Sequence, residues 1–109
     1  MAFDETLATR IRDHIGDHPA LTERKMFGGI AFMIQGNMAV GVSGDDLMVR
    51  IDPATQEATL ARPGVRLFDM TGRPMRGWVL VSPESTRSEE DLAEWIETGV
   101  DFALSLPAK

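Results

Sequence analysis

Cysteine is absent from this sequence of 109 residues. Its absence excludes disulfide bridges, thiolate zinc sites and cysteine nucleophiles, and it fits a reducing compartment. No apolar run approaches the roughly 20 residues that a membrane-spanning helix needs. The acidic start at Asp4 and Glu5 also lacks the basic and then apolar pattern of a signal peptide. We therefore expect a cytoplasmic protein without a membrane association.

A surplus of basic residues is also missing. Seventeen acidic residues stand against eleven lysines and arginines, so the net charge is −6. Domains that bind DNA on their own usually carry a basic surplus, because neutralising phosphates supplies most of their non-specific affinity. Direct binding of nucleic acid is therefore disfavoured. The charge is unevenly placed, since residues 62–76 are rich in arginine and residues 84–101 in acids. These two segments can pair with each other, or each can face a partner.

The sequence has only two histidines, His14 and His18. Their spacing is compatible with a catalytic base or a metal pair, but a hydrolytic triad also needs a nucleophile and an orienting group, and no such pair is visible. The simpler interpretation is two residues at a helix end, where the helix dipole favours a positive charge. The acids at 45–46 and 89–91 are explained by a turn and a helix cap. We expect no enzyme activity, catalytic residue, metal or cofactor.

The composition predicts one globular domain over residues 1–109. Hydrophobic residues make up 43% and charged residues 26% of the chain, and no repeat or linker interrupts it. Three helices are predicted, at about 4–15, from Asp52 and Pro53 to about 60, and from Ser88 to Pro107. The last helix is expected to bury the stripe Leu92, Trp95, Ile96, Gly99, Val100, Ala103 and Leu104.

The segments between these helices have the pattern of strands. The segment Lys25–Phe27 is followed by Gly28 and Gly29 and then by an apolar run. The glycine pair suggests a bulge or a close backbone approach. Apolar strands are expected at 30–34, 38–42, 47–51, 65–68 and 78–81, with turns at Gly36–Asn37 and Ser43–Asp46 and a loop at 71–77. The fold class is therefore α+β: an antiparallel sheet flanked by helices, in the order α-β-β-β-α-β-β-α.

Several of these strands are apolar on both faces. Alternate residues of a strand point to opposite sides, and an antiparallel sheet with one wet face should alternate polar and apolar residues. Residues 30–34, 38–42 and 78–81 do not alternate in this way. Either the helices are divided between the two faces, or another chain covers one of them. We take a homodimer or a partner-binding sheet face as the hypothesis.

A group of arginines with one tryptophan forms the candidate binding site. Its members are Arg50, Arg66, Arg73, Arg76 and Trp78. The planar fork of arginine recognises carboxylate or phosphate, and tryptophan can stack on a guanidinium. The alternative is that the arginines pair with the acidic last helix and that Trp78 is an ordinary core residue.

The order of several motifs resembles the N-terminal domain of the TfoX family of competence regulators. The matching segments are Arg24–Met33, Gly36–Met38, Leu47–Arg50, Pro63–Asp69, Thr71–Val79, Trp95–Ile96 and Ser105–Pro107. The resemblance spans nearly the whole chain and implies an α+β domain with an antiparallel sheet flanked by helices. Full-length members carry a second, C-terminal domain, whereas this sequence ends at Lys109. We therefore expect a stand-alone N-terminal domain.

The resemblance also implies a kind of function. Family members regulate competence genes and resemble co-activators that work with a transcription factor. The resemblance indicates no catalytic residues. The first hypothesis is thus a regulatory binding module with a protein partner, such as a component of the transcription machinery. The alternative is a domain that binds a small anionic ligand through the arginine cluster. An enzyme is the least favoured of the three.

Overall fold

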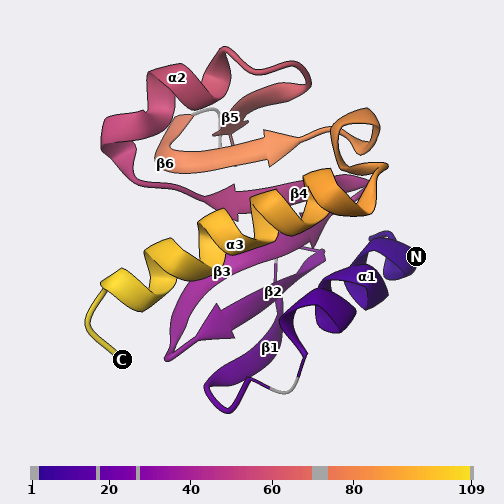
Figure 1. Ribbon diagram of the computed structural model, residues 1–109, viewed down its shortest axis with the longest axis vertical. Helices are drawn as coiled ribbons and strands as arrows, with labels where there is room; N and C mark the ends of the chain where they lie inside the picture. Colours follow the sequence, from indigo (N-terminus) through magenta and orange to yellow (C-terminus); the bar gives the residue numbers. More distant parts are fainter. Residues whose placement is uncertain (1–2, 17, 27, 70–73, 109) are drawn as a thin grey trace.

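The computed structural model describes residues 3–16, 18–26, 28–69 and 74–108. Within these ranges three α-helices and a six-stranded sheet make up the fold (Figure 1). The helices are α1 (Glu5–Ile15), α2 (Gln56–Leu60) and α3 (Glu89–Ser105), with 3-10 turns at Pro53–Thr55 and Pro83–Thr86. The strands are β1 (Leu21–Met26), β2 (Gly29–Ile34), β3 (Asn37–Ser43), β4 (Asp46–Arg50), β5 (Val65–Asp69) and β6 (Pro74–Val81). No described helix has the length and apolarity that a bilayer crossing requires.

The sheet is antiparallel throughout, in the order β1-β2-β3-β4-β6-β5. The first four strands form a meander, and β6 then pairs with β4 and leaves β5 at the edge. The predicted α+β class is confirmed. The structure adds one strand, β1, before the three expected ones. Its charged residues, Glu23 to Lys25, obscured the pattern, and such charges are typical of an exposed edge strand.

The hairpin between β2 and β3 has a two-residue turn. Gln35 and Gly36 have φ angles of 54° and 81°, and positive values at both central positions are the signature of a type I′ turn. The turn therefore lies one residue before the predicted Gly36–Asn37, because Asn37 already pairs with Ile34 in the sheet. At the other end of β2, a Cβ on Gly29 would overlap the carbonyl oxygen of Val42. The close backbone approach expected there is thus confirmed.

The predicted loop at 71–77 is wrong in its second half. Residues 71–73, which include Arg73 of the candidate site, lie outside the described residues, and so does Phe27 of the sequence motifs. Strand β6, however, already begins at Pro74, which pairs with Asp69 of β5. Proline is tolerated at the first position of a strand, so it did not exclude this pairing. Gly77 has a φ of 85° and marks an irregularity within the strand.

The first and last helices begin close to their predicted starts, and a side chain caps each of them. The carboxylate of Asp4 accepts hydrogen bonds from the amides of Thr6 and Leu7 at the start of α1. The hydroxyl of Ser88 accepts one from the amide of Asp91 at the start of α3. One residue of the predicted α3 stripe differs: Leu104 is 42% exposed, because it follows the buried Ala103 and lies about 100° further around the helix.

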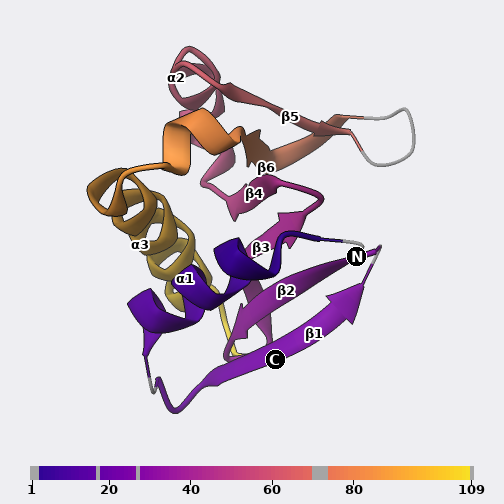
Figure 2. The same cartoon turned by 90° about the vertical axis from the view of Figure 1, so that its right-hand side faces the viewer.

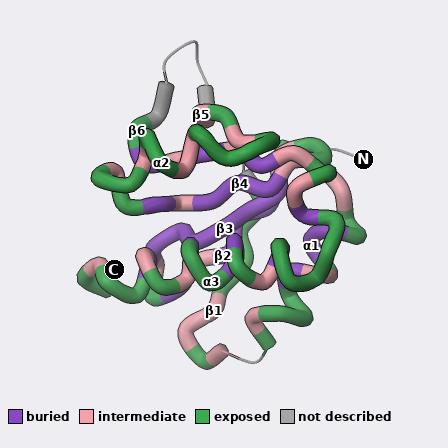
Figure 3. Tube along the Cα trace, turned by 45° about the horizontal axis from the view of Figure 1, so that its top comes forward, coloured by how far each residue is buried: buried purple, intermediate pink, exposed green. Residues whose placement is uncertain are grey.

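All three helices lie on one face of the sheet. Figure 2 shows α1 and α3 together on the same side, and Leu60 of α2 packs against the same core. That core is formed by buried side chains of both layers, which are Leu7, Ala8, Ile11, Ile30, Phe32, Val40, Val42, Leu47, Val49, Ile51, Val79, Val81, Leu92, Trp95 and Ile96. Figure 3 shows the buried residues concentrated in the central strands and the exposed ones on the outer sides of the helices.

The opposite face of the sheet, called the open face below, has no helix over it within the described chain. The described helices are therefore not divided between the two faces. A separate small cluster of Ala31, Met38 and Met48 lies on this face, and the partly buried Met33, Phe68, Trp78 and Leu80 pack against it. Met48 is only 3% exposed, so the methionines are largely covered by neighbouring side chains of the same face.

Candidate functional site

The open face is defined by the strand register. Residues directly opposite one another in an antiparallel pair point to the same side of the sheet. The pairing therefore places on the open face Arg24, Ala31, Met33, Met38, Asp46, Met48, Arg50, Arg66, Phe68, Trp78 and Leu80. The apolar side chains thus occupy the middle of this face, where Ala31, Met38 and Met48 are buried, and charged side chains lie around them. Those that are half-buried are Met33, Phe68, Trp78 and Leu80.

The charge of the open face is opposite to that of the whole chain. Among the residues that the register places there, three arginines stand against one acid, Asp46, although the chain carries a net charge of −6. The acids of α3 are on the other side of the molecule, where Glu90, Glu94, Glu97 and Asp101 are exposed.

Arg50 and Trp78 are the two predicted site residues that the fold brings together. They lie opposite each other on β4 and β6, and the guanidinium carbon of Arg50 is 5.1 Å from the centroid of the Trp78 ring. Phe102, near the C-terminal end of α3, has its ring centroid 5.6 Å from the same carbon. Two aromatic rings from different elements thus hold one guanidinium by cation–π contacts.

Arg66 lies on the same face but is engaged elsewhere. Its guanidinium forms an ion pair with Asp46, across the intervening strand β6. Its Cα is two strands and two residues away from that of Arg50, a separation of about 12 Å from standard strand geometry. Arg50 and Arg66 therefore do not form one anion site, and neither pairs with the acidic helix. Within the described residues, the segment rich in arginine reaches α3 only through Arg62 and Glu94, at 3.7 Å.

The remaining two arginines of the predicted site are not joined to this pair. Arg73 lies outside the described residues. Arg76 is exposed, and the positive φ of Gly77 beside it interrupts the strand alternation, so the register does not assign Arg76 to a face. No described contact links Arg76 to Arg50, Arg66 or Trp78.

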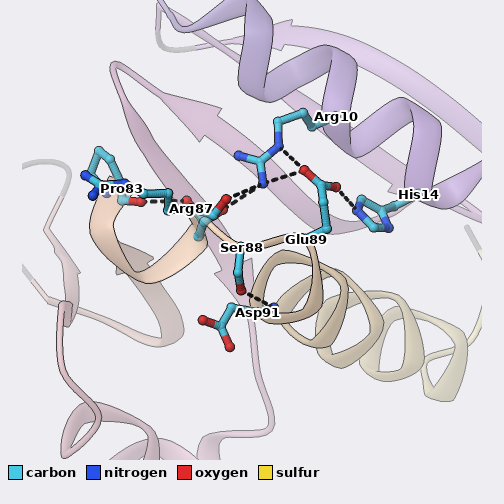
Figure 4. Close-up of polar contacts among 8 residues, drawn as sticks. Arg10, His14, Pro83, Arg87, Ser88, Glu89 and Asp91 are labelled. Atoms are coloured by element: carbon cyan, nitrogen blue, oxygen red, sulfur yellow. Dashed lines mark hydrogen bonds and ion pairs between the residues drawn. The ribbon is translucent and has the colours of Figure 1, made fainter.

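The two histidines have partners within the chain. His14 Nε2 lies 2.7 Å from Oε2 of Glu89, and the other oxygen of that carboxylate accepts a hydrogen bond of 2.9 Å from Nε of Arg10 (Figure 4). These contacts join α1 to the start of α3 and lower the pKa of Glu89, first through the His14 hydrogen bond and then through Arg10. His18 Nδ1 accepts from the amide of Ala20. Among the described residues, no three side chains of the His, Cys, Asp or Glu type are placed to hold a metal ion.

Two shallow clefts lie on the helix side of the molecule. One, of about 260 Å³, is lined by Arg62, Pro63, Glu84, Ser85, Asp91 and Trp95. The other, of about 150 Å³, is lined by His14, Ile15, His18, Ile96, Glu97, Val100 and Asp101. Neither of these two clefts is lined by Arg50 or Trp78.

Comparison with known families shows which family this chain belongs to. The model of the TfoX N-terminal domain matches residues 13–103. The chain belongs to the TfoX N-terminal domain family. No curated protein and no solved structure matched it. The family match of this TfoX N-terminal domain includes all six strands, most of α3 and only the C-terminal end of α1, and therefore the whole open face.

Sequence reasoning missed two members of the open face, Arg24 and Asp46, and the α3 residue that contacts Arg50, Phe102. Phe102 was not part of the predicted apolar stripe of α3, because it lies at the side of the helix and only half-buried. Asp46 was interpreted as a turn residue, and Arg24 belongs to the strand that was not singled out. Alternation with Met48 and Arg50 would have placed Asp46 on their face. No local pattern indicates Phe102, since its contact with Arg50 spans 52 positions.

Proposed function

We propose that this TfoX N-terminal domain is a non-enzymatic protein-interaction module whose open face binds an acidic, partly apolar segment of a partner protein. One observation carries the proposal. All described helices lie on one side of the sheet. The other side presents three arginines together with the half-buried Met33, Phe68, Trp78 and Leu80. The resemblance to competence regulators supports a partner among proteins of transcription.

The composition of the open face supports a protein partner. Aromatic residues, methionine and arginine are the types enriched in the cores of protein interfaces, and methionine adapts its shape to different partners. The positive charge of this face within an acidic protein favours an acidic partner through charge complementarity. Both histidines are engaged in contacts within the chain, which supports a role without catalysis.

A second candidate is the binding of a small anion at Arg50. Its support is the guanidinium of Arg50, which forms no ion pair with any described residue. The separation of Arg50 from Arg66 counts against it, because small polyvalent anions are usually held by several donors at once. The protein-partner proposal accounts for the apolar side chains as well, and we therefore prefer it.

Site-specific photo-crosslinking in the native cell tests the proposal. A photoreactive residue at Met33, on the open face, is expected to capture one defined partner, and the same residue at Thr98, exposed on α3, is not. The identified partner is then purified and its Kd is measured by calorimetry. Capture of a second copy of this chain would instead establish a homodimer, and capture from Thr98 alone would refute the open face as the binding surface.

Two neighbouring residues of β1 provide a matched pair of charge reversals. Arg24 and Lys25 are both exposed, but the register points them to opposite faces of the sheet. Arg24→Glu is expected to weaken binding of the purified partner about tenfold, a free-energy change of about 1.4 kcal/mol. Lys25→Glu changes the net charge by the same amount and is expected to leave the Kd within about twofold. Equal losses in the two variants would contradict a face-specific contact.

A further inference from the structure

We propose that Arg50 is the anchor of the open face and binds the side-chain carboxylate of a glutamate or aspartate in the partner segment. This inference rests on the function proposed above, and it names the chemical group that the face recognises. It starts from the position of Arg50, whose guanidinium lies over the rings of Trp78 and Phe102 at 5.1 and 5.6 Å.

Among the described arginines without an ion pair, Arg50 is half-buried, whereas Arg24, Arg76 and Arg87 are exposed. Arg10, Arg12, Arg62 and Arg66 each form an ion pair with a carboxylate of the chain. Among the described residues, Arg50 forms no ion pair and no side-chain hydrogen bond, although it is half-buried. Aromatic contacts therefore hold its side chain in place, and its N–H donors are not used by the described part of the chain.

The cation–π contacts leave the guanidinium available to a carboxylate. Its five N–H groups are fixed donors in one plane, and none of them donates a hydrogen bond to a described residue. A carboxylate that approaches in this plane can accept two parallel hydrogen bonds. Because the rings already restrict the side chain, less conformational freedom is lost on binding than for a freely moving arginine.

The surroundings of Arg50 favour a carboxylate of a protein segment over a phosphate. Arg66 is about 12 Å away by strand geometry and is already paired with Asp46. A single free guanidinium matches the single charge of a carboxylate, whereas a phosphate dianion is usually held by several donors. Trp78, Met48 and Leu80 on the same face provide apolar contacts, which suit apolar residues beside the acid in a peptide.

Synthetic peptides test this anchor directly. The probes are 12-residue peptides with one central glutamate between leucine, isoleucine or phenylalanine residues, and matched peptides with glutamine or phosphoserine in place of the glutamate. Kd values are measured by calorimetry for the full chain and for Arg50→Gln, Arg50→Lys and Lys25→Gln. Circular dichroism and thermal unfolding confirm that each variant is folded.

The unmodified chain is expected to bind glutamate peptides about tenfold more tightly than glutamine peptides. Arg50→Gln should abolish this preference, Arg50→Lys should retain only part of it because lysine lacks the planar fork, and Lys25→Gln should retain all of it. In the amide and side-chain NMR spectrum, the Nε–H signal of Arg50 should shift with glutamate peptides only.

Three outcomes would overturn the anchor. Peptide binding without a preference for glutamate, or a preference that survives in Arg50→Gln, refutes Arg50 while leaving the open face as a binding surface. Tighter binding of the phosphoserine peptides assigns Arg50 to phosphate instead. If the unmodified chain binds no peptide of any set and no cellular partner is captured at Met33, the proposed function itself fails.

Discussion

The carboxylate of Glu89 accepts a hydrogen bond of 2.9 Å from Nε of Arg10, which is 79 positions earlier in the chain. His14 lies against the other oxygen of the same carboxylate. Arg10 in addition donates to the carbonyl oxygen of Thr86, just before α3. This group joins α1 to the start of α3 (Figure 4). It thereby positions two of the helices on the face of the sheet opposite the open face.

Glu89→Gln is expected to lower the stability of the domain in a manner that depends on pH. The pKa of Glu89 is lowered from its ordinary value of 4.5, so its contacts favour the folded state while the carboxylate is ionised. This contribution is fully present above the ordinary pKa and is lost as the pH falls through the lowered pKa of the folded state. Urea denaturation at several pH values measures it.

The stability difference between the wild type and Glu89→Gln should therefore be largest near neutral pH and shrink in acid. Glu90→Gln is the control, because Glu90 is the exposed neighbour and forms no ion pair with a described residue. A difference that stays constant from neutral pH to below pH 4 would show that the carboxylate charge is not what joins the helices.

Gly99→Ala is expected to destabilise the domain by about 1–3 kcal/mol through overpacking. A Cβ at this position would overlap the carbonyl oxygen of Ala39 and lie 2.7 Å from Cγ1 of Val40. Alanine favours helices by about 1 kcal/mol over glycine, so a purely local effect has the opposite sign. Thr98→Ala, at an exposed position of the same helix, provides the comparison in chemical denaturation. Increased stability of Gly99→Ala would refute the close approach of α3 to β3.

Asn37→Ala is expected to cost about 1–2 kcal/mol, as for a buried hydrogen bond. Asn37 is 1% exposed, and its Nδ2 donates to the carbonyl oxygen of Pro107 at 2.9 Å. A chain shortened to end at Leu106 removes the acceptor. If this bond ties the residues after α3 to the sheet, the two changes should be clearly less than additive in a double-mutant cycle. Additive effects would mean that the bond contributes little.

The two tryptophans should differ in their importance for folding. Trp95 is 2% exposed in the main core, and Trp95→Ala is expected to cost about 3–5 kcal/mol. Trp78 is half-buried on the open face, and Trp78→Ala should cost clearly less while weakening partner binding. Thermal unfolding and calorimetry measure the two effects. A loss of stability at Trp78 as large as that at Trp95 would make it a core residue and not a binding residue.

Much of the fold could be predicted from local patterns. The caps Asp52 and Ser88 and the alternation of Leu47, Val49 and Ile51 each act over a few residues, and each was confirmed. Strand β1 was missed because half of its residues are charged, and charged residues at an edge have the same local pattern as a loop. The strand becomes recognisable only through its pairing with β2.

The candidate site was predicted only in part. Arg50 and Trp78 were both selected by residue type, but their contact depends on the pairing of β4 with β6, strands separated by α2 and β5. The engagement of Arg66 by Asp46 likewise depends on a side chain that crosses a whole strand. Residue type indicates what a side chain can bind, whereas its distance from other side chains is set by the register of the sheet.

By itself, the sequence determined the helix boundaries, most of the strands, the membership of the TfoX N-terminal domain family and the apolar character of both sheet faces, since these depend on short-range periodicity and on ordered motifs. Only the tertiary structure decided that all described helices cover the same face and that Arg50 lies between Trp78 and Phe102. The reason is physical: which face a helix covers depends on the path of the chain around the sheet, and local side-chain patterns do not specify that path.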